Sequence, residues 1–396
     1  MTRAARAQAH TALFYAAMFG ALGAHLPFWP VWLTAWGLSP QEAGFFLSLS
    51  FVARISAGLL IPVLADRSGR RRITMAALAI AGALVFAAHA AIGTRAALLA
   101  ATVISGGLIS ATMPLGEALG SGAATRFGFS YALPRALGSL GFLIANFAVG
   151  ALMARLGPDA ALWWIVVLLA AAAALALRHP GGAKQDRAPP NFAEIGRLIL
   201  HPIFALFLLA GTMTMSSHAV YYTYSSVRWQ SLGIGPQTIG ALWAFSVAVE
   251  VVFMLTLGRR LIGWIGPLGA LMLAAAGGVV RWGLMAFDPV LPLLWPLQAL
   301  HVLTFAAGHL GCIAFIAAAV PERLNASAQG AFMGLAAGIL TVAAMALAAW
   351  AYPSLGGGVY WIAAAMSAAG LALTLTLRRR WAGACLSFHA PSRSPG

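Results

Sequence analysis

Residues 45–87 read FFLSLSFVARISAGLLIPVLADRSGRRRITMAALAIAGALVFA. Two apolar runs flank a short turn that is rich in arginine, and each run is close to the length of about 20 residues that crosses a hydrocarbon core of roughly 30 Å. Charges gathered in a short turn between two such runs are typical of a helical hairpin in a membrane. The segment therefore predicts two membrane-spanning helices joined by a basic loop.

The same pattern extends along the whole chain. Of its 396 residues, 61% are hydrophobic and 8% are charged, whereas soluble domains carry about 25% charged residues. This composition excludes a soluble protein and predicts an all-α integral membrane protein. We expect twelve membrane-spanning helices, at residues 11–36, 42–65, 73–93, 96–119, 131–154, 160–177, 199–225, 236–257, 265–286, 291–319, 328–352 and 357–377.

The formal net charge of +15 would suggest nucleic-acid binding in a soluble protein. Here the basic residues lie in short loops. If the N-terminus is cytoplasmic, the cytoplasmic segments collect nearly all of them, and the opposite side receives only Arg95, Arg155 and Arg228. This bias follows the positive-inside rule. It predicts a multi-pass protein of the bacterial inner membrane with both termini in the cytoplasm, a lipid bilayer as its surroundings, and no nucleic-acid partner.

One long polar loop, from His179 to about Gly196, divides the helices six and six. Transporter folds that are built from structural repeats have such a linker, with the substrate site near the midplane between the halves. We therefore predict an N-terminal six-helix half at 1–178, a cytoplasmic linker at 179–198, a C-terminal six-helix half at 199–377, and a cytoplasmic tail at 378–396.

Five charged residues remain inside the predicted helices, and each costs at least about 2.5–3.5 kcal/mol at a helix centre unless it is paired or solvated. They indicate a polar cavity inside the bundle, and the alternative is a set of structural ion pairs. Five histidines at the same depth fit either interpretation, since a hydrogen-bonded histidine is common in helix packing. The charges are Arg54, Glu117, Arg135, Glu250 and Arg281, and the histidines are His25, His89, His218, His301 and His309.

Other classes of membrane protein find less support. No H-E-x-x-H or G-x-S-x-G motif occurs, and Cys312 and Cys385 have no metal-ligand spacing, so we expect no enzyme, no metal and no cofactor. A channel would need rings of like charge or a filter segment. A receptor on the same fold that does not transport remains an alternative.

The basic loop in the opening segment carries Asp66, Arg67, Gly69 and Arg70. An acid near a helix end can hold neighbouring arginines and helix ends in one conformation, as a charged latch. The pattern resembles the loop signature of the major facilitator superfamily, although that signature has a glycine where this chain has Pro62. The resemblance implies that these residues gate a conformational change.

Several helices resemble the lactose-permease-like proton symporters of this superfamily. The motifs that carry the resemblance are Leu26–Leu33, Pro114–Ala118, Arg135–Ser139 and Val280–Gly283. A closer likeness is to the phenylpropionate permeases, through His218–Tyr222, Val249–Phe253 and Leu300–Phe305. Together these motifs span roughly residues 11 to 375. The resemblance implies the twelve-helix fold and a secondary transporter.

The resemblance also implies roles for individual residues. Glu117 and Arg135 match the charged pair that contacts substrate in lactose-type permeases. Glu250 matches the acid that links substrate binding to protonation, and Arg281 and His301 match its polar partners. The chain departs from the lactose pattern at Thr304, where an acid is expected one turn after the histidine. We therefore expect Glu250 to carry the proton.

The solute is less closely defined by the sequence. Trp29, His218 and Tyr222 are further candidates for contacts with a small-molecule substrate, and an arginine fork suits a carboxylate. We expect symport of protons with a small organic solute, best an aromatic carboxylate of the phenylpropionate type, by a protein that acts as a monomer. A sugar or nucleoside symporter, or an exporter of the same fold, is the alternative.

Overall fold

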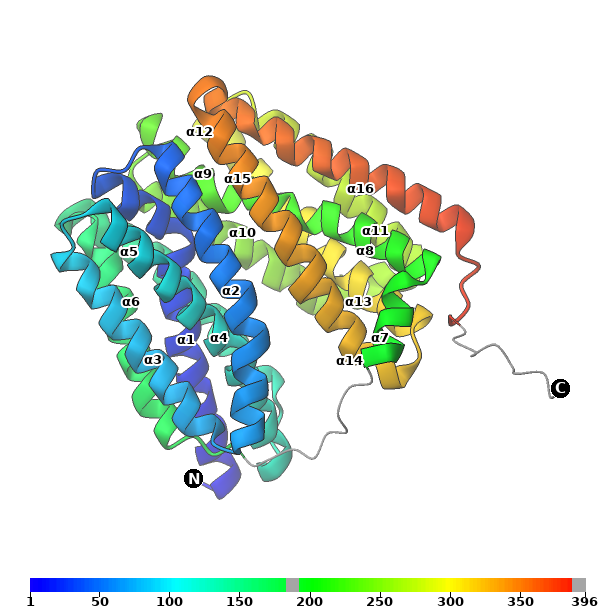
Figure 1. The fold of residues 1–396 in the computed structure, drawn as a ribbon, viewed down its shortest axis with the longest axis horizontal. Coiled ribbons are helices and arrows are strands. Elements are labelled where there is room, and N and C mark those ends of the chain that lie inside the picture. Colours follow the sequence, from blue (N-terminus) through cyan, green and yellow to red (C-terminus); the bar gives the residue numbers. More distant parts are fainter. Residues whose placement is uncertain (183–191, 387–396) are drawn as a thin grey trace.

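The computed structural model describes residues 1–182 and 192–386, and the described part is helical with short connections (Figure 1). The side chains of Asp66, Phe192, Arg259, Ala326 and residues 335–337 also lie outside what is described. The N-terminal half contains α1 Arg3–Ala35, α2 Pro40–Ser68, α3 Arg71–Ala88, α4 Arg95–Phe127, α5 Ala132–Leu156 and α6 Asp159–Leu177.

The C-terminal half begins with a short helix that overlaps the end of the range predicted as linker and runs two residues beyond it. Three of its spans are continued by a second helix, in two cases through a π-helical turn, at Val302–Ala307 and Ala331–Ala336. Its helices are α7 Phe192–Leu200, α8 Pro202–Ser216, α9 His218–Ser231, α10 Pro236–Thr256, α11 Gly258–Met285, α12 Leu291–Ala299, α13 Gly308–Ala319, α14 Asn325–Gly330, α15 Ala337–Leu355 and α16 Tyr360–Arg380.

The described helices make twelve crossings. Eleven continuous helical stretches are long and apolar enough to span a membrane, and the last of them, Glu322–Arg380, contains both α15 and α16. The chain reverses between these two helices at Gly356, where φ is +51°. The predicted all-helical, twelve-span fold is therefore confirmed, and the protein is a multi-pass membrane protein.

Most helices begin or end a few residues away from the predicted bounds, for example α1 at Arg3 and α4 at Phe127, and two of the differences have a clear physical reason. The seventh span runs on past Arg228 to Ser231, because Arg228 forms an ion pair with Asp288 and its charge is thereby matched. The ninth span was predicted to begin at residue 265, whereas α11 begins at Gly258. Its backbone breaks at Gly266, where φ is +69°, and Pro267 follows, so the predicted start coincides with the break inside the helix.

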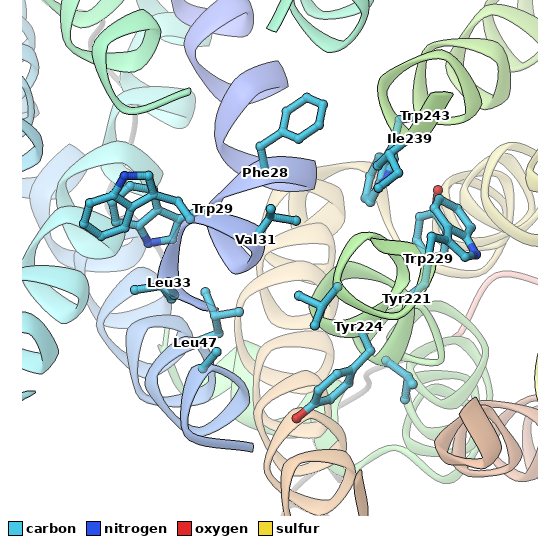
Figure 2. Close-up of a cluster of buried hydrophobic side chains, with 14 of the residues drawn as sticks. Phe28, Trp29, Val31, Leu33, Leu47, Tyr221, Tyr224, Trp229, Ile239 and Trp243 are labelled. Atoms are coloured by element: carbon cyan, nitrogen blue, oxygen red, sulfur yellow. The ribbon is translucent and has the colours of Figure 1, made fainter. Parts of the chain in front are cut away.

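The two halves meet along α5 with α10 and along α2 with α15. We call the end of the bundle where α6 ends and α7 begins the linker side, and the opposite end the far side. Toward the far side, one buried cluster joins the halves: Figure 2 shows Phe28 and Val31 of α1 and Leu47 of α2 together with Tyr221 of α9 and Trp243 of α10. Apolar burial between the halves therefore stabilises closure of the far side.

Backbone contacts tighten the same region. A Cβ atom at Gly240 of α10 would lie 2.2 Å from the carbonyl oxygen of Asn146 on α5, and one at Gly150 would lie 2.6 Å from the carbonyl oxygen of Pro236. Tyr224 donates a hydrogen bond from its hydroxyl to the carbonyl oxygen of Pro40, at 3.3 Å. Any side chain at Gly240 would thus push α10 away from α5.

We expect Gly240→Leu to open the far side. Overpacking of a close contact costs about 1–3 kcal/mol, and the contact here is with backbone, which cannot rotate away. In a background with both native cysteines replaced by serine, a cysteine at the almost fully buried Val31 should react about tenfold faster with a membrane-impermeant thiol reagent when Gly240→Leu is present.

Gly235→Leu is the matched control, since no heavy atom lies within 4 Å of a Cβ placed there and its φ of −69° suits any residue. Equal reactivity of the Val31→Cys thiol in both variants would show that the Gly240 contact does not hold the far side closed.

Candidate functional site

A cavity of about 200 Å³ lies between the two halves at mid-depth. From the N-terminal half it is bounded by side chains of α1 and α5, and from the C-terminal half by side chains of α9, α10 and the segment that joins α12 to α13. The lining residues are Phe19, Leu22, Leu26, Arg135, Ser139, Phe142, Tyr221, Tyr222, Trp243, Ser246, Val247, Glu250, His301 and Phe305. This central cavity is lined mostly by aromatic and aliphatic side chains and carries one arginine, one glutamate and one histidine.

On the N-terminal side, Arg135 and Glu117 form an ion pair, with Arg135 Nε 3.1 Å from Glu117 Oε1. The other carboxylate oxygen accepts hydrogen bonds from the hydroxyls of Tyr15, at 3.2 Å, and Tyr131. The Arg135 guanidinium also lies 4.3 Å above the ring centre of Phe19. Both charged side chains are about 40% exposed, and Arg135 lines the central cavity.

On the C-terminal side, Glu250, His301 and Arg281 form a chain. His301 Nε2 lies 3.2 Å from Glu250 Oε2, and Arg281 Nη1 lies 3.1 Å from His301 Nδ1. Because an arginine only donates hydrogen bonds, His301 Nδ1 must accept one from Arg281. In a neutral imidazole the proton is then on Nε2, which donates a hydrogen bond to the carboxylate of Glu250. The predicted partners of Glu250 are thus both present, one directly and one through the imidazole.

Thr304 occupies the position where the lactose pattern has an acid. Its hydroxyl accepts a hydrogen bond from Arg281 Nη1 at 2.9 Å and lies 3.2 Å from His218 Nε2. Arg281 also donates to Gln298 Oε1 at 3.0 Å, and the hydroxyl of Tyr221 donates to the same oxygen. Within the described part of the chain, Arg281 therefore has neutral acceptors only, and Glu250 is the acid that lies nearest along this network.

Three predicted substrate contacts are not among the residues that line the central cavity: Glu117, which reaches it only through its ion pair with Arg135, Trp29 and His218. Trp29 is fully buried against Trp32 and His89, and Figure 2 shows its ring on the opposite side of α1 from Phe28. His218 is also buried, with Nδ1 3.1 Å from the carbonyl oxygen of Met215 and Nε2 near Thr304. Tyr222 does line the cavity, as predicted.

Sequence comparison agrees with this architecture. The profile of the MFS_1 like family matches residues 9–361. The chain belongs to the MFS_1 like family.

Two relatives of known description show how the chain sits within that family. It is 31% identical to the probable 3-phenylpropionic acid transporter of Escherichia coli (strain K12), over 89% of this chain and 93% of that protein. It is 26% identical to the maltose permease of Geobacillus stearothermophilus, over 83% of each chain.

Solved structures give the same fold. The nucleoside transporter NupG, in a mutant form, superposes with a TM-score of 0.83 at 16% identity, over 94% of this chain and 99% of that one. A D-xylose-proton symporter superposes with a TM-score of 0.66 at 14% identity, over 94% and 96%. The protein is therefore a secondary transporter of the major facilitator type, as the resemblance of its motifs implied.

In the described residues, no group of three or more histidine, cysteine or acidic side chains is placed to hold a metal ion.

Several cavity residues of this MFS_1 like protein were not singled out from the sequence, although their spacing from the charged residues could have identified them. Ser139 and Phe142 follow Arg135 at i+4 and i+7, and Trp243 and Ser246 precede Glu250 at i−7 and i−4. These spacings lie on one helix face. Extending each helix face from its charged residue would have found them. Tyr131 precedes Arg135 at i−4 and is found by the same rule, whereas Tyr15 reaches Glu117 from α1 and had no such signal.

The predicted gating loop lies on the linker side of this MFS_1 like protein. α2 ends at Ser68, Gly69 has a φ of +65°, and α3 begins at Arg71. Arg67 and Arg70 are exposed. A residue with a side chain would be strained at Gly69, so the turn requires glycine. The side chain of Asp66 lies outside the described part of the structure, and the latch stays a prediction.

We expect Asp66→Asn to slow transport about tenfold while equilibrium binding of solute changes little, since a latch acts on the rate of the conformational change. Initial rates in liposomes and binding to purified protein measure the two effects, with Glu322→Gln, which removes another acid on the linker side, as the control. An equal loss of both, or no loss of either, would remove the latch from the account.

Proposed function

We propose that the protein takes up a small organic acid together with protons, and that its solute is an aromatic carboxylate of the phenylpropionate type. The observation that carries the proposal is the central cavity, where aromatic side chains surround Arg135 and the Glu250–His301 pair. The likeness to the probable 3-phenylpropionic acid transporter supports the same class of solute.

The cavity lining favours an aromatic acid over a sugar. Tyr221, Tyr222 and Trp243 offer ring faces and edges to a phenyl group. A sugar would bring many hydroxyls, each of which needs a hydrogen-bond partner once it leaves water. The polar lining consists of Arg135, Ser139, Ser246, Glu250 and His301. A sugar proton symporter is the second candidate, because the maltose permease is a relative at 26% identity.

The charges at mid-depth suggest how protons and an anion are coupled. Three arginines and two glutamates sum to +1 when both acids are ionised and the histidines are neutral. One proton on Glu250 raises the sum to +2, and one bound carboxylate returns it to +1. Charge at membrane depth is costly, so the empty form and the doubly loaded form should move between states more readily than a form that carries a proton alone.

The direction of transport and the orientation in the membrane belong to the same proposal. The excess of basic residues on the linker side supports a cytoplasmic location for that side and for both termini, in a bacterial inner membrane. The far side then faces outward, and the protein works as a monomer by alternating access. An exporter of the same fold would share this orientation and differ in the direction of net flux.

A thermal-shift screen of the purified protein tests the class of solute. Phenylpropionate-type acids should raise the melting temperature in a concentration-dependent way, because a ligand that binds the folded state stabilises it. Maltose, xylose and nucleosides should leave it unchanged. Stabilisation by a sugar or a nucleoside, with none by aromatic acids, would overturn the proposed substrate class.

A further inference from the structure

Of the three arginines at mid-depth, two have their charge or their donors engaged. Arg135 is paired with Glu117. Arg281 has only neutral acceptors among the described residues, at Gln298, Thr304 and His301, and its Nε has no partner. Because Arg281 is completely enclosed, a solute carboxylate cannot reach it in this conformation.

Arg54 is different. It lies at the middle of α2, and its guanidinium carbon is 4.3 Å above the ring centre of Phe51. Among the side chains that the structure describes, no carboxylate lies within 4.0 Å of it, and none of its nitrogens donates a hydrogen bond to protein. A guanidinium left at membrane depth without an acid is costly, so an anion that neutralises it would be held strongly.

Arg54 also borders open space of a suitable size. A cavity of about 580 Å³ lies where α2 and α4 face α14 and α15, and Arg54, Ser110 and Thr341 are among its lining residues. This volume is typical of sites for small organic ligands. Ser110, on α4, has a hydroxyl that forms no hydrogen bond within the described residues. We call this space the Arg54 cavity.

The Arg54 cavity and the central cavity are neighbours. Leu26 and Tyr222 line the central cavity, and the same two residues border a small pocket of about 10 Å³ that Arg54 also borders. Tyr222 and Arg54 thus lie on one small pocket between the two cavities.

We propose that Arg54 binds the carboxylate of the transported acid, with the Ser110 hydroxyl as a second donor and the aromatic ring of the acid directed toward Tyr222. This inference rests on the proposed function, since it takes the solute to be an organic acid. It assigns carboxylate recognition to Arg54 in place of Arg135 or Arg281. Arg54 then supplies selectivity for the ionised group, and the central cavity supplies selectivity for the ring.

The test compares 3-phenylpropionate with its uncharged amide, 3-phenylpropanamide, by titration calorimetry on purified protein. We expect the wild type to prefer the acid. Arg54→Gln should lower affinity for the acid by about tenfold to a hundredfold, as removal of a charged hydrogen bond does, and leave affinity for the amide unchanged. Arg54→Lys keeps the charge and should recover part of the preference.

Arg155→Gln, which removes an arginine from the far end of α5, is the matched control and should bind like the wild type. If the wild type binds the acid and Arg54→Gln keeps the full preference for acid over amide, or loses both ligands equally, the inference is overturned and the proposed function stands. If the wild type binds no aromatic acid, the proposed function fails and the inference falls with it.

Discussion

Glu250→Gln should abolish accumulation of solute against a gradient while exchange of solute across the membrane continues. Glutamine keeps the shape and the hydrogen bond from His301 but cannot ionise, so it mimics the protonated acid permanently. The form loaded with anion then keeps a mid-depth charge of +1 and can reorient, whereas the empty form stays at +2 and cannot readily return. We expect uphill uptake to fall by at least about a hundredfold, since such a carrier has no route for the proton.

Uptake driven by a pH gradient and exchange of labelled for unlabelled solute, both in liposomes, measure the two activities. Glu322→Gln removes an exposed acid at the linker side and is the control for loss of one negative charge. If Glu250→Gln still accumulates solute with normal pH dependence, the proton travels elsewhere, and His301, His309 or Glu117 become the candidates.

Removing the charge of Arg135 should abolish detectable binding of the acid while the protein still folds and inserts. In Arg135→Ala, the carboxylate of Glu117 loses its ion-pair partner, and its uncompensated negative charge beside the cavity repels an anionic solute. We expect affinity for the acid to fall by about a hundredfold. Calorimetry measures affinity, and elution as a single detergent-solubilised species shows that the variant folds.

The double variant Arg135→Ala, Glu117→Gln separates repulsion from direct recognition. If Arg54 holds the carboxylate, removal of the stranded Glu117 charge should restore most of the affinity. A double variant that binds as weakly as Arg135→Ala would place the carboxylate on Arg135 itself. Unchanged affinity in the single variant would show that the pair is structural.

Most of the fold could be predicted from the sequence, because membrane-spanning helices depend on local composition and length. The errors arose where distant residues decide the outcome. Arg228 looked like the end of a span until its pairing with Asp288 was known, and nothing in the sequence shows that these residues, far apart in the chain, lie together. The halves at 1–178 and 199–377, with the linker at 179–198, are consistent with the helix order, and the residues of the linker from 183 to 191 lie outside the described part.

The site was predicted in part for a similar reason. Charged residues at membrane depth are conspicuous in a sequence, so Glu117, Arg135 and Glu250 could be singled out, and the structure brings Arg135 and Glu250 to one cavity. Whether an arginine has an acidic partner depends on the folded chain. The sequence shows that Arg54 is a charge at membrane depth, but it does not show that no described carboxylate lies near it. Trp29 and His218 were chosen by residue type, and packing turned both away from the cavity.

Transport of 3-phenylpropionate into liposomes under an imposed pH gradient tests the central claim most directly. Because the neutral form of a carboxylic acid crosses bilayers unaided, protein-free liposomes and liposomes with Glu250→Gln set the baseline. The account predicts that the wild-type protein accumulates labelled acid well above that baseline and that a protonophore removes the excess. Binding of the acid without any gradient-driven accumulation above the baseline, or accumulation that a protonophore leaves intact, would contradict it.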